Sequence, residues 1–188
     1  MFKDAKHAVR WAEARLNRSK VKNTIAPLLK SAQKGAGDLS AEDLDDLALT
    51  ISSMAREISP PAGVALMAVY GIPSPERDIE LADAMVLHNT MNLSKRDFDA
   101  SQALSYVTPN QHAVLMRCVI HSERSITQGF GAMPRRQIYD LSGLTHDKYN
   151  KHGIADVYRL SQGMLRDWVD GAARQLEVKL DAIDMLSD

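Results

Sequence analysis

Apolar residues recur at intervals of three and four along most of this chain, which is the spacing of one face of an α-helix. The longest run covers 44–58, where Leu, Ala, Ile and Met residues hold one face over several turns. Ser40 precedes this run and Asp43 follows three positions later, an arrangement that predicts a capped helix start. Pro60 and Pro61 predict the end of the helix.

Later segments repeat the same pattern between turn residues. We expect helices over 64–70, over 76–91, over 95–105 with Ser94 as the N-cap, and from Pro109 onward. The residues expected to face inward in the second and fourth of these helices are Ile79, Ala82, Met85, Val86, Val114, Leu115, Cys118 and Val119. Aromatic residues make up 5% of the chain and β-branched residues rarely alternate, so the pattern predicts an all-α, multi-helix fold.

The pattern also divides the chain into four consecutive segments. A basic N-terminal segment, either two short helices or an arm that orders on binding, precedes a central helical body. A glycine-containing connection then leads to a helix-turn-helix and a long C-terminal helix. The expected bounds are 1–37, 38–121, 122–133 and 134–188. The chain has no apolar run of about 18 residues and no secretory signal, so we expect no membrane contact and a cytoplasmic location.

The net charge of −1, from 23 basic and 24 acidic residues, conceals an uneven distribution. Residues 1–37 contain nine Lys and Arg against two acidic residues, whereas 38–46 contain five acidic residues and no base. Residues 117–151 contain six bases and three acidic residues. This asymmetry favours a polyanion or a charged protein as partner, and solvated helix faces explain it equally well.

The sequence lacks the common motifs of nucleotide-binding, hydrolytic and zinc-dependent enzymes. It contains no GxxxxGK[ST], GxGxxG or GxSxG motif and no HExxH pair. The one cysteine, Cys118, lies on an apolar helical stripe and is expected to be a small buried hydrophobe. His146 and His152 are six residues apart, which does not place two imidazoles on one helix face at ligand spacing. We therefore expect no enzyme, no metal site and no cofactor.

The segment 133–168 carries the strongest indication of function. Pro134 suits the first position of a helix, in which Ile138 and Leu141 are expected to face inward. Gly143 provides a turn residue that tolerates positive φ. A helix, a glycine turn and a second helix form a helix-turn-helix, although most tight helical hairpins in all-α proteins bind no DNA.

The second helix of this motif is expected to start at Thr145 as N-cap, with Lys148 three residues later and Leu144 as the buried turn residue. The side chains expected to project from it are of types that reach phosphates and base edges. Two arginines lie at the start of the first helix, where backbone N–H groups favour phosphate. The expected DNA-binding residues are Arg135, Arg136, Thr145, His146, Lys148, Tyr149, Lys151 and His152.

The stretch GLTHDKYNKHGIADVYRLSQGMLRDWVDGAARQLEVKL resembles the C-terminal region of the Q-type late antitermination proteins of lambdoid phages. The family pattern is a Leu-Thr pair after the turn, an aromatic residue, a nearby basic residue and a long amphipathic helix. Here these are Leu144, Thr145, Tyr149, Lys151 and the helix from Ile154. Upstream, DLALTISSMAREISPPAGVALMAVYGI is similar to the family's central helix and the apolar helix after it, in the same order along the chain.

The resemblance implies a phage protein that works in the bacterial cytoplasm. Family members bind double-stranded DNA at the late promoter, load onto a paused RNA polymerase that contains sigma factor, and reshape its RNA exit channel so that terminator hairpins cannot form. In that setting the basic segment would contact nucleic acid, including nascent RNA, or an acidic polymerase surface. Its residues are Lys3, Lys6, Arg10, Arg15, Arg18, Lys20 and Lys22.

The sequence also departs from the family pattern. The relatives insert a cysteine-rich zinc-binding module before the helix-turn-helix, whereas this chain has SERSITQGFGAMP at 122–134 and no ligands there. The resemblance therefore implies a zinc-free variant. Two other functions stay open: a dimeric helix-turn-helix repressor or activator that binds a palindromic site, and a helical adaptor or inhibitor that binds no nucleic acid.

Overall fold

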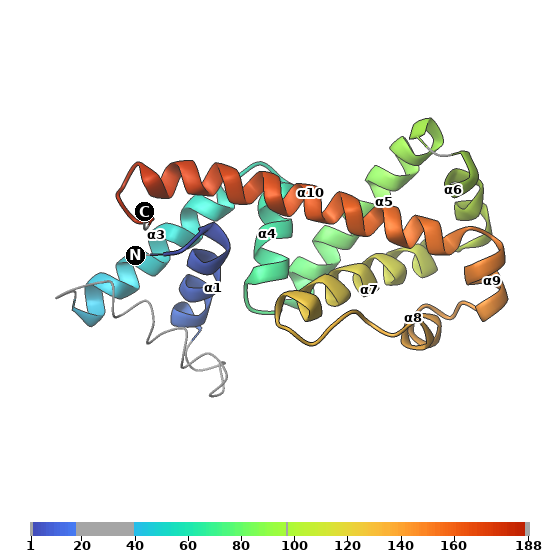
Figure 1. The fold of residues 1–188 in the computed structure, drawn as a ribbon, viewed down its shortest axis with the longest axis horizontal. Helices are drawn as coiled ribbons and strands as arrows, with labels where there is room; N and C mark the ends of the chain where they lie inside the picture. The colour runs from blue at the N-terminus through green and yellow to red at the C-terminus, as the bar shows by residue number, and fades with distance from the viewer. Residues whose placement is uncertain (1, 18–39, 97, 187–188) are drawn as a thin grey trace. The chain divides into compact units, whose positions relative to one another are not determined.

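A computed structural model describes residues 2–17, 40–96 and 98–186 of the chain (Figure 1). Within these ranges the regular structure is helical, which confirms the predicted all-α class. The described residues form no strand, and Phe2 and Leu186 make an isolated parallel bridge. None of the described helices is both long enough and apolar enough to cross a membrane.

The helices group into two compact units, Met1–Pro73 with Trp168–Asp188, and Ser74–Asp167. The first unit contains α1 (Ala5–Leu16), α3 (Ala41–Arg56), α4 (Ala62–Tyr70) and the C-terminal part of α10 (Ile154–Asp181). The second contains α5 (Pro75–Arg96), α6 (Phe98–Ala103), the 3-10 helix η1 (Leu104–Tyr106), α7 (Pro109–Thr127), α8 (Arg135–Ser142), α9 (His146–Lys151) and the N-terminal part of α10. This grouping differs from the four consecutive segments expected from the sequence, because the basic α1 packs against α3 and α4.

In the first unit, α3 begins as the sequence predicted. The Ser40 hydroxyl accepts a hydrogen bond from the Asp43 backbone N–H, and the Asp43 carboxylate accepts one from the Ser40 N–H. This reciprocal pair satisfies two N–H groups that the helix itself leaves unpaired. The apolar face that follows is buried, with Leu44, Ala48 and Ile51 in the core.

Helix α1 is part of this core and is not a free arm. Its buried face consists mostly of small residues around Trp11. Arg15 is 5% exposed, forms an ion pair with Asp45 at 2.6 Å and donates a hydrogen bond to the Ala41 carbonyl. The expectation that Arg15 contacts a partner is therefore wrong, because its guanidinium is enclosed at the start of α3.

In the second unit, α5 is longer than the sequence pattern indicated. Ser94 lies within α5, so it is not the N-cap of a separate helix. Ala82 and Met85 are buried as expected, but Ile79 is 49% exposed and does not face the core. The helical spacing of apolar residues predicts which residues share a face of α5. Neighbouring helices bury Ala82 and Met85 on this face and leave Ile79 in contact with solvent.

Helix α7 starts at Pro109, with Thr108 and Gln111 forming a capping box. Its predicted core positions Leu115, Cys118 and Val119 are buried. The helix continues to Thr127, so the connection expected over 122–133 begins later than predicted. The backbone turns in this connection at Gly129 and Gly131, both with positive φ.

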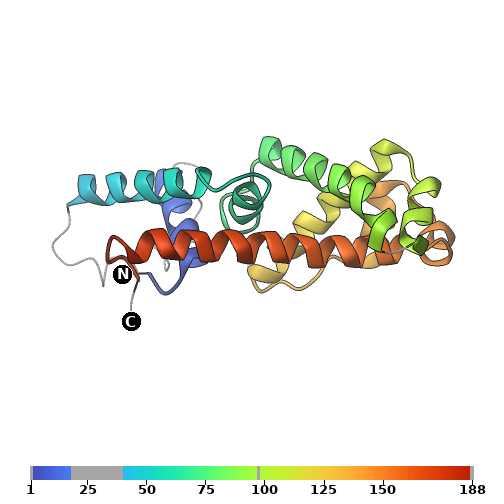
Figure 2. The same cartoon turned by 90° about the horizontal axis from the view of Figure 1, so that it is seen from above.

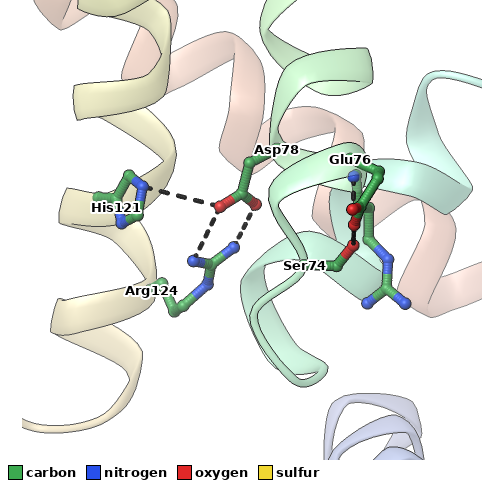
Figure 3. Close-up of polar contacts among 6 residues, drawn as sticks. Ser74, Glu76, Asp78, His121 and Arg124 are labelled. Carbon is green, nitrogen blue, oxygen red and sulfur yellow. Dashed lines mark hydrogen bonds and ion pairs between the residues drawn. The ribbon is translucent and has the colours of Figure 1, made fainter.

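A buried ion pair joins α5 to α7 (Figure 3). Both nitrogens at the end of the Arg124 guanidinium donate to the Asp78 carboxylate, and both side chains are buried. His121 lies 3.7 Å from the same carboxylate, while burial and the nearby Arg124 charge lower the pKa of its imidazole. The residue before Arg124 on α7, Glu123, accepts two hydrogen bonds from Arg166 of α10.

The N-terminal part of α10 also joins α5 through buried polar groups. Asn89 donates to the Ser161 hydroxyl at 2.9 Å, and that hydroxyl donates to the Val157 carbonyl. Asn89 and Ser161 are both buried, so these hydrogen bonds satisfy groups that would otherwise destabilise the core. Figure 2 shows α10 as one continuous helix.

Replacing Arg124 with Met should destabilise the second unit by about 3–5 kcal/mol, because it leaves the Asp78 carboxylate buried without its cation. The double variant Asp78→Leu/Arg124→Met should recover most of this loss. Urea unfolding followed by circular dichroism measures both. As a control, Arg159→Ala removes an exposed ion pair with Asp156 and should change stability by less than about 0.5 kcal/mol. Equal effects of Arg124→Met and Arg159→Ala would contradict the role assigned to the buried pair.

Gly63 of α4 should tolerate no side chain. A Cβ atom there would lie 2.7 Å from the Ile58 carbonyl oxygen and 2.8 Å from that of Ala55. Because both are backbone atoms, Gly63→Ala should destabilise the first unit by about 1–3 kcal/mol. Gly163→Ala is the matched control, since a Cβ at this helical position meets no atom within 4 Å; it should stabilise by about 0.5–1 kcal/mol. Thermal melts of the two variants should therefore shift in opposite directions.

Candidate nucleic-acid interface

The candidate interface begins with α8, which starts at Arg135. Pro134 has extended backbone angles and precedes the helix as its N-cap. The expectation that it occupies the first helical position is therefore wrong. Ile138 and Ser142 form the buried face, and the Ser142 hydroxyl donates to the Ile138 carbonyl. Leu141 is 54% exposed, so the expectation that it faces inward is wrong.

The turn after α8 has the predicted residues in the predicted places. Gly143 adopts the left-handed conformation at φ 64° and ends the helix. Leu144 is buried. The Gly143 carbonyl accepts a hydrogen bond from the Gln111 side chain at 3.1 Å, which ties the turn to the start of α7.

Helix α9 starts as expected, because the Thr145 hydroxyl accepts a hydrogen bond from the Lys148 backbone N–H. Thr145 itself, His146, Lys148, Lys151 and His152 are exposed, as projecting side chains must be.

Tyr149 does not project with them. It is 3% exposed, with its ring 5.0 Å from that of Tyr139 and 6.4 Å from that of Tyr158. Burial raises the pKa of its hydroxyl, as do the two neighbouring tyrosines. Tyr149 therefore anchors α9 to α8 and α10, and its expected contact with DNA is wrong for the described fold.

The exposed cations of this region differ in their surroundings. Within the described residues, Arg135, Arg136 and Lys148 form no ion pair. Lys151 lies 3.3 Å from the Asp147 carboxylate, and His146 lies 3.7 Å from it. The unpaired cations therefore come from the first turn of α8 and the middle of α9.

Two aromatic contacts in this region had no recognisable pattern in the sequence. Tyr106 of η1 stacks on His152 at 4.1 Å, although the two residues are far apart in the chain. Tyr139 contacts the His146 ring edge-on, and its hydroxyl accepts a hydrogen bond from Asn150. The two contacts position His152 and His146, which the sequence analysis had included among the expected DNA-binding residues.

The basic residues Lys3, Lys6 and Arg10 belong to the first unit, and α8 and α9 belong to the second. Lys3 is exposed. Lys6 forms an ion pair with Asp170 at 2.7 Å, and this hydrogen bond raises the pKa of its ammonium group. Lys6 and Arg10 both lie over the Tyr70 ring. The other three basic residues expected to bind a partner, Arg18, Lys20 and Lys22, are outside the described residues.

Among the described residues, no group of three or more His, Cys, Asp or Glu side chains is placed to hold a metal ion. Cys118 is buried, and burial raises the pKa of its thiol to about 11. Comparison with protein-family models, curated proteins and solved structures found no match for this chain.

Proposed function

We propose that this chain binds double-stranded DNA through α8 and α9 and acts as a phage-type antitermination factor on bacterial RNA polymerase. The observation that carries the DNA-binding step is that Arg135, Arg136 and Lys148 are exposed on these helices and form no ion pair with any described residue. Cations that no carboxylate neutralises are the ones that replace counterions on a phosphate backbone.

The packing beneath these cations supports the proposal. Ile138 anchors α8, Leu144 anchors the turn and Tyr149 anchors α9, and all three side chains are buried. These anchors hold the backbone of α8 and α9 in place, so less backbone entropy is lost when the surface binds.

The first turn of α8 adds backbone donors to this charge. Pro134 has no side chain able to cap the helix, and no side-chain hydrogen bond is made at this position. The first N–H groups of the helix are then free to donate to a phosphate oxygen next to Arg135 and Arg136.

The antitermination step is supported by the sequence resemblance. In this proposal, DNA binding places the protein beside a paused polymerase, and the protein then stays with the enzyme and keeps terminator hairpins from forming. A repressor or activator that uses the same helices would change how many transcripts start. An antiterminator changes the fraction of transcripts that continue past a terminator.

The double variant Arg135→Ala/Arg136→Ala should bind any duplex about tenfold more weakly than the parent. The slope of log K against log salt should flatten by about 0.9 for each arginine that contacts a phosphate. Fluorescence anisotropy with a labelled duplex over a range of salt concentrations measures both quantities. Unchanged affinity and slope would contradict DNA binding through α8.

Substitutions within α9 give a matched comparison. Lys148→Ala should weaken binding more than Lys151→Ala, because Asp147 already neutralises part of the Lys151 charge. Asp147→Asn should strengthen binding, since it removes an anion and releases Lys151. The reverse order of the two lysine variants would show that α9 does not face the DNA as proposed.

Single-round transcription tests the antitermination step. The template carries a late promoter, its promoter-proximal pause and a downstream intrinsic terminator, and the enzyme is bacterial RNA polymerase with sigma factor. We expect the protein to raise the fraction of transcripts that pass the terminator severalfold, and Arg135→Ala/Arg136→Ala to abolish this effect. An unchanged terminated fraction, with DNA binding intact, would eliminate antitermination and favour the dimeric repressor or activator.

A further inference from the structure

The loop between α7 and α8 presents an aromatic ring to solvent. Phe130 is 77% exposed, the largest value among the large apolar side chains in the described ranges. Folded proteins rarely gain from such exposure, because an aromatic ring is stabilised by leaving water. In proteins that bind single-stranded nucleic acid, exposed aromatic rings are the groups on which bases stack.

The backbone around Phe130 is held in a defined conformation. The Phe130 N–H donates to the Ser125 carbonyl at 3.0 Å, and the Met133 N–H donates to the Ser122 hydroxyl at 3.1 Å. Gly129 and Gly131, on either side, have φ of 85° and 82°, a region that residues with side chains seldom adopt. The ring is therefore projected by a loop that is hydrogen-bonded back to α7.

The loop itself carries no charge, and the two arginines of α8 that follow it favour a polyanion over a protein pocket as the partner. Residues 128–136 contain two arginines and no acidic residue. Arg135 follows Phe130 by five residues, and an extended chain advances at most about 3.6 Å per residue. The Cα atoms of Phe130 and Arg135 therefore lie within about 18 Å of each other, which corresponds to about five base pairs along a DNA duplex.

We propose that Phe130 stacks on an unpaired or unstacked base of the DNA that α8 holds by its phosphates. This inference rests on the proposed DNA binding and specifies its preferred substrate, a duplex that contains a locally opened segment. Stacking suits this role because every base has a π face, so the ring needs no particular sequence. The neighbouring arginines supply the contact with the backbone.

The test uses two probes, a mixed-sequence duplex of about three helical turns and the same duplex with a short central bubble of unpaired bases. The full-length protein should bind the bubble about tenfold more tightly than the closed duplex. Phe130→Ala should lose this preference and keep the parent's affinity and salt dependence on the closed duplex. Phe130→Trp should keep the preference, and its additional emission should be quenched when the bubble probe is added.

Leu141→Ala is the matched control, because Leu141 is an exposed apolar side chain of α8 that cannot stack on a base. It should retain the preference for the bubble. The inference is overturned if Phe130→Ala keeps that preference, if Leu141→Ala loses it equally, or if the parent has none.

The outcomes also separate this inference from the function on which it rests. If the parent binds the closed duplex through Arg135 and Arg136 but shows no effect of Phe130, only the stacking role fails. If Arg135→Ala/Arg136→Ala leaves binding to both probes unchanged, the proposed DNA interface fails as well. Binding of a protein partner that depends on Phe130, without any effect on DNA, would likewise overturn the stacking role.

Discussion

The buried ion pair between Asp78 and Arg124 is the constraint on which the second unit depends. Two charges removed from water are tolerated only when each satisfies the other, so the pair specifies one position of α7 against α5. Helix α7 also makes polar contacts with other elements of this unit. Glu123 binds Arg166 of α10, the Cys118 carbonyl accepts a hydrogen bond from Tyr158, and Gln111 binds the turn after α8. The candidate interface is thus positioned by a helix that is itself fixed by buried polar contacts.

The distribution of charge in the fold differs from the charge counted along the sequence. Arg124 contributes to the basic character of 117–151, but it is buried against Asp78. Lys151 forms an ion pair with Asp147. Arg15 of the N-terminal segment is buried and forms an ion pair with Asp45. Pairing therefore concentrates the available positive charge on fewer side chains than the sequence suggested. From the end of α7 to the end of α9, the cations that form no ion pair among the described residues are Arg135, Arg136 and Lys148.

The region from the end of α7 to the end of α9 combines two kinds of surface. Its helices present cations above buried anchors, and its loop presents Phe130 between two glycines. The first surface suits phosphates and the second suits the face of a base. Tyr106, stacked on the exposed His152, adds another exposed aromatic ring to this region from a distant part of the chain. The proposed contact with nucleic acid rests on these features together.

Features that depend on a few neighbouring residues could be predicted from the sequence. The caps at Ser40 and Thr145, the proline start of α7 and the glycine turn at Gly143 follow from local hydrogen bonds and backbone angles. The all-α class followed from the same local periodicity. The site residues on α8 and α9 came from this pattern too, and most of them are exposed as expected.

Only the tertiary structure decided which apolar and charged side chains found partners. Ile79 and Leu141 have helical spacing suited to a core but face solvent, whereas Tyr149 was expected to face DNA and is buried. Arg15 was expected to contact a partner, but it is buried in an ion pair with Asp45. The physical reason is that periodicity defines the faces of a helix, while burial depends on the helices that cover each face, and those come from distant parts of the chain.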